Sequence, residues 1–152
     1  MELDRILDDI NKRLNDTQQT LSIVYHQIYD TIRLTENIRY EPIEAYEIIH
    51  ELERVIEHAR TLLFSAGDSV HLAITTIYRI EGDWIKSDDQ ADALNELLGY
   101  CQTLLVQLQQ VDSVLVRSLF QLDNPLNLDE GDFIYARSVI QDMLLTLRNI
   151  QF

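Results

Sequence analysis

The sequence has little of the residue types that make sharp turns or metal and redox sites. It contains one cysteine, two prolines and four glycines among 152 residues. Few glycines and prolines disfavour β-sandwiches and barrels, which need many tight turns. Because Cys101 is alone, the chain can form neither an intramolecular disulfide nor a cysteine-based metal site. The sequence therefore favours a protein built from helices.

Several sequence motifs and segments are also absent. There is no G-x-x-x-x-G-K, G-x-G-x-x-G or G-x-S-x-G motif, so the sequence predicts no phosphate-binding loop, no cofactor and no nucleophile elbow. No run of about 18 apolar residues is present, so no membrane span is expected. The start, Met-Glu-Leu-Asp-Arg, lacks the basic and apolar regions of a signal peptide. We expect a cytoplasmic protein that does not bind membranes.

Basic residues are scarce. The chain has twelve lysines and arginines and 26 acidic residues, and the formal net charge is −14. A field of that sign repels phosphate, so direct binding to nucleic acid or anionic lipid is disfavoured. The acidity has two readings: it keeps the chain soluble, or it imitates a nucleic-acid backbone to occupy the basic groove of another protein.

What the sequence does have is a repeat of apolar residues at alternating steps of four and three, from Leu3 to Ile38. Eight of the eleven positions are apolar. The members are Leu3, Leu7, Ile10, Leu14, Thr17, Leu21, Val24, Ile28, Thr31, Thr35 and Ile38. This is the spacing of an a/d seam, so it predicts one long helix that packs against other helices.

Similar seams recur downstream. Pro42 suits the first turn of a second helix near Glu41, Gly67 suits a helix end, and Ser87-Asp88-Asp89-Gln90 fits a capping box. We expect helices near 2–38, 42–65, 69–82, 88–122 and 129–150, the last capped by Asn127 or Asp129. The predicted fold class is all-α: one domain, residues 1–152, forming an elongated antiparallel bundle of four to five helices with coiled-coil-like heptad seams.

One local pattern resembles a metal motif in its spacing. Glu47 and His50 form an E-x-x-H, which di-iron bundles use in pairs together with further glutamates. No histidine follows His71, so the second half of such a site is missing. We expect Glu47 and His50 to face solvent and expect no metal.

The predicted helix 88–122 has an unusual composition. From Leu97 to Leu122 only Asp112 and Arg117 are charged, and apolar residues also occur off the seam. An ordinary amphipathic helix has one apolar stripe and a charged back. This helix is therefore either central in a monomeric bundle or covered by another chain. For the second case the candidate interface residues are Val106, Gln109, Val116 and Phe120, and a homodimer is expected.

Function follows mostly by exclusion. With no recognisable reaction centre, the sequence favours a non-enzymatic module for protein–protein interaction, such as an adaptor, scaffold component or inhibitor, whose partner is another protein. The alternative is an acidic inhibitor of a nucleic-acid-binding protein. Its candidate residues share roughly one face of the second helix at about one-turn spacing, 5–6 Å. They are Glu41, Glu44, Glu47 and Glu51.

Overall fold

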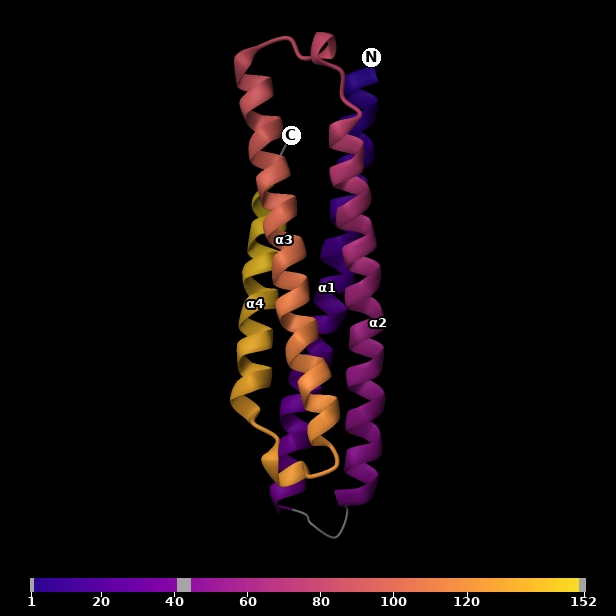
Figure 1. Cartoon of the computed structure of the whole chain (residues 1–152), viewed down its shortest axis with the longest axis vertical. Coiled ribbons are helices and arrows are strands. Elements are labelled where there is room, and N and C mark those ends of the chain that lie inside the picture. The colour runs from indigo at the N-terminus through magenta and orange to yellow at the C-terminus, as the bar shows by residue number, and fades with distance from the viewer. Residues whose placement is uncertain (1, 41–44, 151–152) are drawn as a thin grey trace.

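The chain forms an all-α bundle of long helices (Figure 1), as the sequence predicts. A computed structural model describes residues 2–40 and 45–150, and these contain no strand. The four long helices are α1 (Glu2–Tyr40), α2 (Ala45–Tyr78), α3 (Asp88–Gln121) and α4 (Glu130–Asn149). Two short 3₁₀ turns, η2 (Gly82–Trp84) and η3 (Pro125–Asn127), lie in the connections before α3 and α4.

Consecutive helices run in opposite directions along one axis, which makes the bundle elongated (Figure 1). Helix α1 packs against α2 and α4, and α3 packs against the same two helices. Helices α1 and α3 therefore occupy diagonal corners of the bundle. Helix α4 has 20 residues and α3 has 34, so α4 ends well short of the end that carries η2 (Figure 1).

The four-and-three repeat of α1 forms its buried face. Every position of the repeat is buried except Leu7, which is half-buried. The three threonines of the repeat are also buried, and each hydroxyl donates to a backbone carbonyl of its own helix. Internal hydrogen bonds let a hydroxyl enter a core without an unpaired donor.

The expected helix break at Gly67 is wrong. Helix α2 continues from Ala45 to Tyr78, so the predicted helices 42–65 and 69–82 are one helix. A glycine inside a helix costs only about 1 kcal/mol relative to alanine. Buried Ala66 and Val70 lie on either side of Gly67, and their packing in the core outweighs that cost. The predicted start near Glu41 lies outside the described residues.

The other helix ends follow the predicted chemistry. The Ser87 side chain accepts a hydrogen bond from the Gln90 backbone N–H at 3.2 Å, and the Gln90 side chain accepts one from the Lys86 N–H at 2.7 Å. Of the two candidates for the last helix, Asp129 is the cap, accepting from the Gly131 N–H at 2.8 Å. The bonds to Ser87 and Asp129 satisfy N–H groups that a helix leaves unpaired at its start.

Candidate interaction surface

Helix α3 is a corner of the bundle and not a central helix. Its deepest side chains, such as Leu104 and Leu115, are fully buried, while Val106 is 57% exposed and Phe120 79% exposed. The alternative in which a monomeric core covers all sides of this helix is therefore wrong for the residues described. Val106 and Phe120, two apolar residues off the seam, face outward.

The four candidate residues lie on one side of α3, which we call the α3 stripe: Val106, Gln109, Val116 and Phe120. At roughly 100° per residue they fall within an arc of roughly 80°, on the side away from Leu104 and Leu115. Gln109 is exposed and Val116 is half-buried. The structure thus brings all four predicted residues onto one face.

The two charged residues in this half of α3 are paired with neighbouring helices. Asp112 accepts from Arg60 of α2, with Nε to Oδ1 at 2.8 Å and Nη2 to Oδ2 at 3.4 Å. This hydrogen bond raises the pKa of Arg60. Arg117 lies 3.3 Å from Asp132 of α4. One pair joins α3 to α2 and the other joins α3 to α4. The outward side of α3 between the two pairs therefore carries no charge.

One residue that the sequence analysis missed borders the stripe. Phe64 of α2 is 73% exposed and lines a shallow hollow of about 200 Å³ together with Gln109 and the Arg60–Asp112 pair. Phe64 follows directly after Leu63, a core residue, so it stands one position off the α2 seam. An aromatic residue at such a position is the signal that could have found it.

The predicted acidic row on α2 is only partly described. Glu41 and Glu44 lie outside the described residues, and Glu47 is exposed. Glu51 pairs with Arg54, one turn further along the same helix, and this hydrogen bond raises the pKa of Arg54. A base therefore lies next to the end of the row and neutralises one of its charges.

The E-x-x-H pattern faces solvent, as expected. Glu47 and His50 are both exposed, and the His50 ring lies 3.3 Å from the Tyr46 hydroxyl through Nε2. In residues 2–40 and 45–150, no group of three or more His, Cys, Asp or Glu side chains could hold a metal ion.

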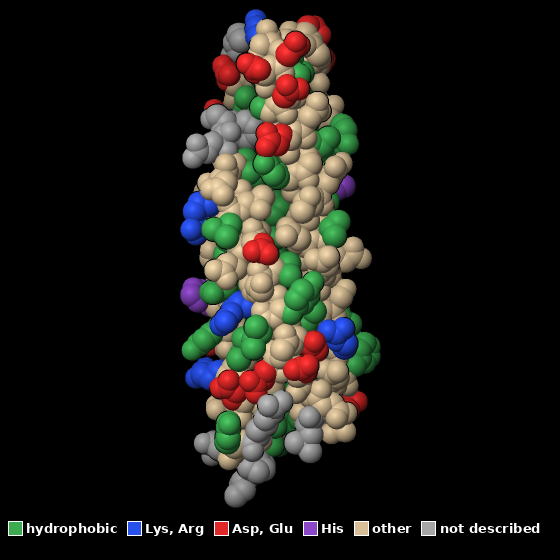
Figure 2. Space-filling model, turned by 90° about the vertical axis from the view of Figure 1, so that its left-hand side faces the viewer, with side chains coloured by type: hydrophobic (Ala, Val, Ile, Leu, Met, Phe, Trp, Pro, Cys, Tyr) green, Lys and Arg blue, Asp and Glu red, His purple; other side chains and the backbone are tan. Residues whose placement is uncertain are grey.

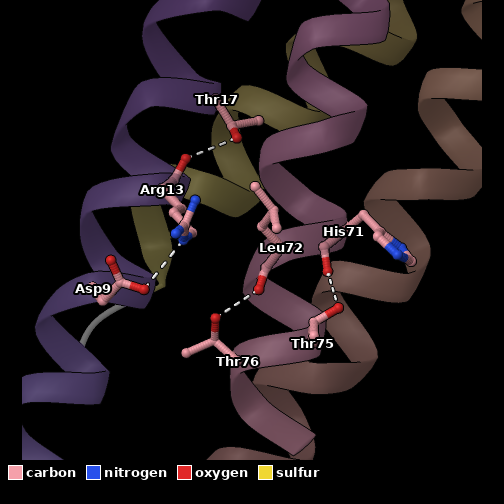
Figure 3. Close-up of polar contacts among 7 residues, drawn as sticks. All are labelled: Asp9, Arg13, Thr17, His71, Leu72, Thr75 and Thr76. Carbon is pink, nitrogen blue, oxygen red and sulfur yellow. Dashed lines mark hydrogen bonds and ion pairs between the residues drawn. The ribbon is translucent and has the colours of Figure 1, made fainter. Parts of the chain in front are cut away.

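A groove between α1 and α2 is lined by three arginines, of which Figure 3 draws Arg13. Arg5, Arg13 and Arg79 line a hollow of about 380 Å³ with Asp9 and two threonines. The polar groups that Figure 3 draws are engaged within their own helices: Arg13 pairs with Asp9 at 3.2 Å, and the hydroxyls of Thr75 and Thr76 donate to carbonyls one turn earlier. These contacts stabilise each helix and create no cross-helix site.

Cys101 is buried in the core. Burial raises the pKa of its thiol to about 11, because the thiolate would be poorly solvated there. We expect native protein at pH 8 to react with a thiol reagent at least about 100-fold more slowly than unfolded protein, since both access and the thiolate fraction are low. Absorbance of the released thiol chromophore, with and without urea, measures this. Equal rates would show that the α3 core opens readily.

Comparison with known protein families, with curated proteins and with solved structures finds no match. No helix among the described residues is both long enough and apolar enough to cross a membrane. The function proposed for this chain therefore rests on its own surface.

Proposed function

We propose that this chain is a non-enzymatic protein–protein interaction module that self-associates through the α3 stripe, and that it works in the cytoplasm as an adaptor, scaffold component or inhibitor. The observation that carries the proposal is the exposure of Phe120 and Val106 on a side of α3 that has no charge. Large exposed apolar side chains that share one face are typical of interaction sites.

Burial of the apolar side chains of this face would contribute favourable free energy to a dimer. Burying a phenylalanine side chain stabilises by about 1.5–3 kcal/mol. In a two-fold symmetric contact each residue is buried twice, once from each copy. Gln109 fits this face because an uncharged amide loses less on desolvation than a carboxylate or an ammonium group does. Phe64 would extend the same contact across to α2.

A paired substitution tests the proposal. We expect Val106→Ser with Phe120→Ser to raise the dimer dissociation constant about 100-fold, because the apolar area is lost from both copies. Both residues are exposed, so the circular dichroism spectrum should not change. Sedimentation equilibrium measures the dissociation constant.

The matched control is Ile23→Ser, which removes an exposed aliphatic side chain from α1, the helix diagonal to α3. It should change the dissociation constant by less than about twofold. If the control raised the dimer dissociation constant as much as the paired variant does, the contact would not be confined to α3.

The alternative, an acidic inhibitor that imitates a nucleic acid, has weaker support. Its binding would depend on a row of carboxylates, and Glu51 is already paired with Arg54. Exposed charge contacts also weaken steeply with salt. If Glu47→Lys with Glu51→Lys abolished binding to a partner, and if salt weakened that binding as well, mimicry would replace the interface on α3.

A further inference from the structure

The end of the bundle that carries η2 has an apolar groove between α2 and α3. It has a volume of about 250 Å³. Seven of its eight lining residues are Ile, Leu, Ala or Tyr: Ile77, Tyr78, Ile80, Ile85, Ala91, Leu94 and Leu98, with Asn95 as the eighth. Several of these side chains are only half-buried, so the groove presents apolar surface to solvent.

The groove lies at the end of the bundle that α4 does not reach. Arg117, near the end of α3, pairs with Asp132 at the start of α4. Because α4 is 14 residues shorter than α3, α4 ends before it reaches the first turns of α3 (Figure 1). At this end α3 therefore has fewer neighbours in its own chain than further along.

The surroundings of the groove are strongly acidic. Residues 77–98, which span the lining residues, contain six acidic residues and two bases, Arg79 and Lys86. The six are Glu81, Asp83, Asp88, Asp89, Asp92 and Glu96, and all are exposed. At roughly 100° per residue, Asp89 and Glu96 lie on the side of α3 away from Leu98, which leaves the other four as the acidic rim. Figure 2 shows acidic side chains gathered at the upper end of the molecule, the end at which η2 lies in Figure 1. An apolar groove with an acidic rim is complementary to an apolar helix face flanked by lysine or arginine.

We propose that this groove docks a basic amphipathic helix of a partner protein, which places apolar side chains between α2 and α3 and its cationic side chains against the acidic rim. The site shares no residue with the α3 stripe, and Leu98 lies about 12 Å along the helix from Val106, the nearest residue of the stripe. Failure of this proposal would therefore leave the proposed dimer untouched.

The only tryptophan of the chain reports on this groove. Trp84 lies in η2 directly before Ile85, which lines the groove. The probe is a tryptophan-free amphipathic peptide of about 18 leucines and lysines, long enough to form a helix on binding. We expect it to shift the emission of Trp84 to shorter wavelength and to saturate. A peptide with glutamate in place of lysine, and a Leu/Lys peptide scrambled to lack an apolar face, should both leave Trp84 unchanged.

Two variants test the apolar contact. Leu98→Gln should raise the dissociation constant for the Leu/Lys peptide at least about fivefold, because it places an amide in the groove. Asn95→Lys changes an exposed side chain at the rim, so the fold should be kept and only the charge should oppose the peptide. Circular dichroism checks both variants. Unchanged affinity in Asn95→Lys would overturn the proposal even if Leu98→Gln failed to fold.

The rim is tested by removing three carboxylates. Replacing Glu81 by Gln and Asp83 and Asp92 by Asn should raise the dissociation constant for the Leu/Lys peptide about fivefold at low salt. The matched control neutralises three exposed acids on α2, far from the groove. It should raise the same dissociation constant less than about twofold. These are Glu47, Glu53 and Glu57.

Three results would overturn the proposal. Equal weakening by the rim variant and its control would show attraction to the net charge of the chain alone. A shift of the Trp84 emission with the glutamate peptide would show that the acidic rim plays no part in binding. A shift of Trp84 with protein concentration, in the absence of peptide, would show that a second copy of this chain occupies the groove.

Discussion

Gly67→Pro should destabilise the protein by at least about 3 kcal/mol. Proline removes the backbone N–H that a helix interior needs, and its ring clashes with the carbonyl four residues earlier. Helix α2 is continuous through Gly67, and Leu63, Ala66 and Val70 around it are all buried. A kink at this point would therefore pull core side chains apart. Urea unfolding at one fixed protein concentration measures the loss.

The matched variant at the same position is Gly67→Ala. A Cβ atom built at Gly67 meets nothing within 4 Å, and no glycine in the described chain has a positive φ. Alanine should therefore stabilise by about 0.5–1 kcal/mol. Opposite signs for proline and alanine would establish the continuous helix. A loss below about 1 kcal/mol for proline would instead mean that α2 is broken near Gly67, as the sequence alone suggests.

Leu115→Ala should cost about 2–5 kcal/mol, because it leaves a cavity in a packed core. Leu115 is fully buried and lies on the side of α3 away from the α3 stripe. The size of the loss therefore reports which face of α3 enters the bundle. The free energy of unfolding in urea is again the measured quantity.

The control for this substitution is Leu145→Ala on α4, where the side chain is 48% exposed. It should cost less than about 1 kcal/mol, since much of that side chain already contacts water. If Leu145→Ala cost as much as Leu115→Ala, the burial pattern assigned to these helices would be contradicted.

Sequence periodicity was enough to predict the fold class and three of the helices. The repeat in α1 is regular, so it fixes one buried face over the whole of Glu2–Tyr40. Ser87 and the acids after it predict the start of α3, because a cap is a local interaction. The break at Gly67 was wrong because a glycine signal is weak, while the burial of Ala66 and Val70 depends on the other helices.

The candidate surface was predicted on α3 but not beyond it. The charge gap from Leu97 to Leu122 is visible in the sequence. Which side of α3 faces outward is a tertiary property, because apolar residues occur around most of the helix. The Arg60–Asp112 pair joins residues 52 positions apart, and Phe64 comes beside Gln109 only when α2 packs on α3. Local spacing carries no information about such neighbours.

The solution molar mass tests the central claim, self-association through the α3 stripe, most directly. Light scattering on a size-exclusion column, with protein loaded from about 5 to about 200 µM, follows the equilibrium through the affinities expected for a small apolar contact. The prediction is a mass that rises with concentration toward twice the 17.8 kDa of the chain. Under the same conditions Val106→Ser with Phe120→Ser should stay at the mass of one chain. A wild-type protein that remains at 17.8 kDa at the highest concentration would contradict the claim.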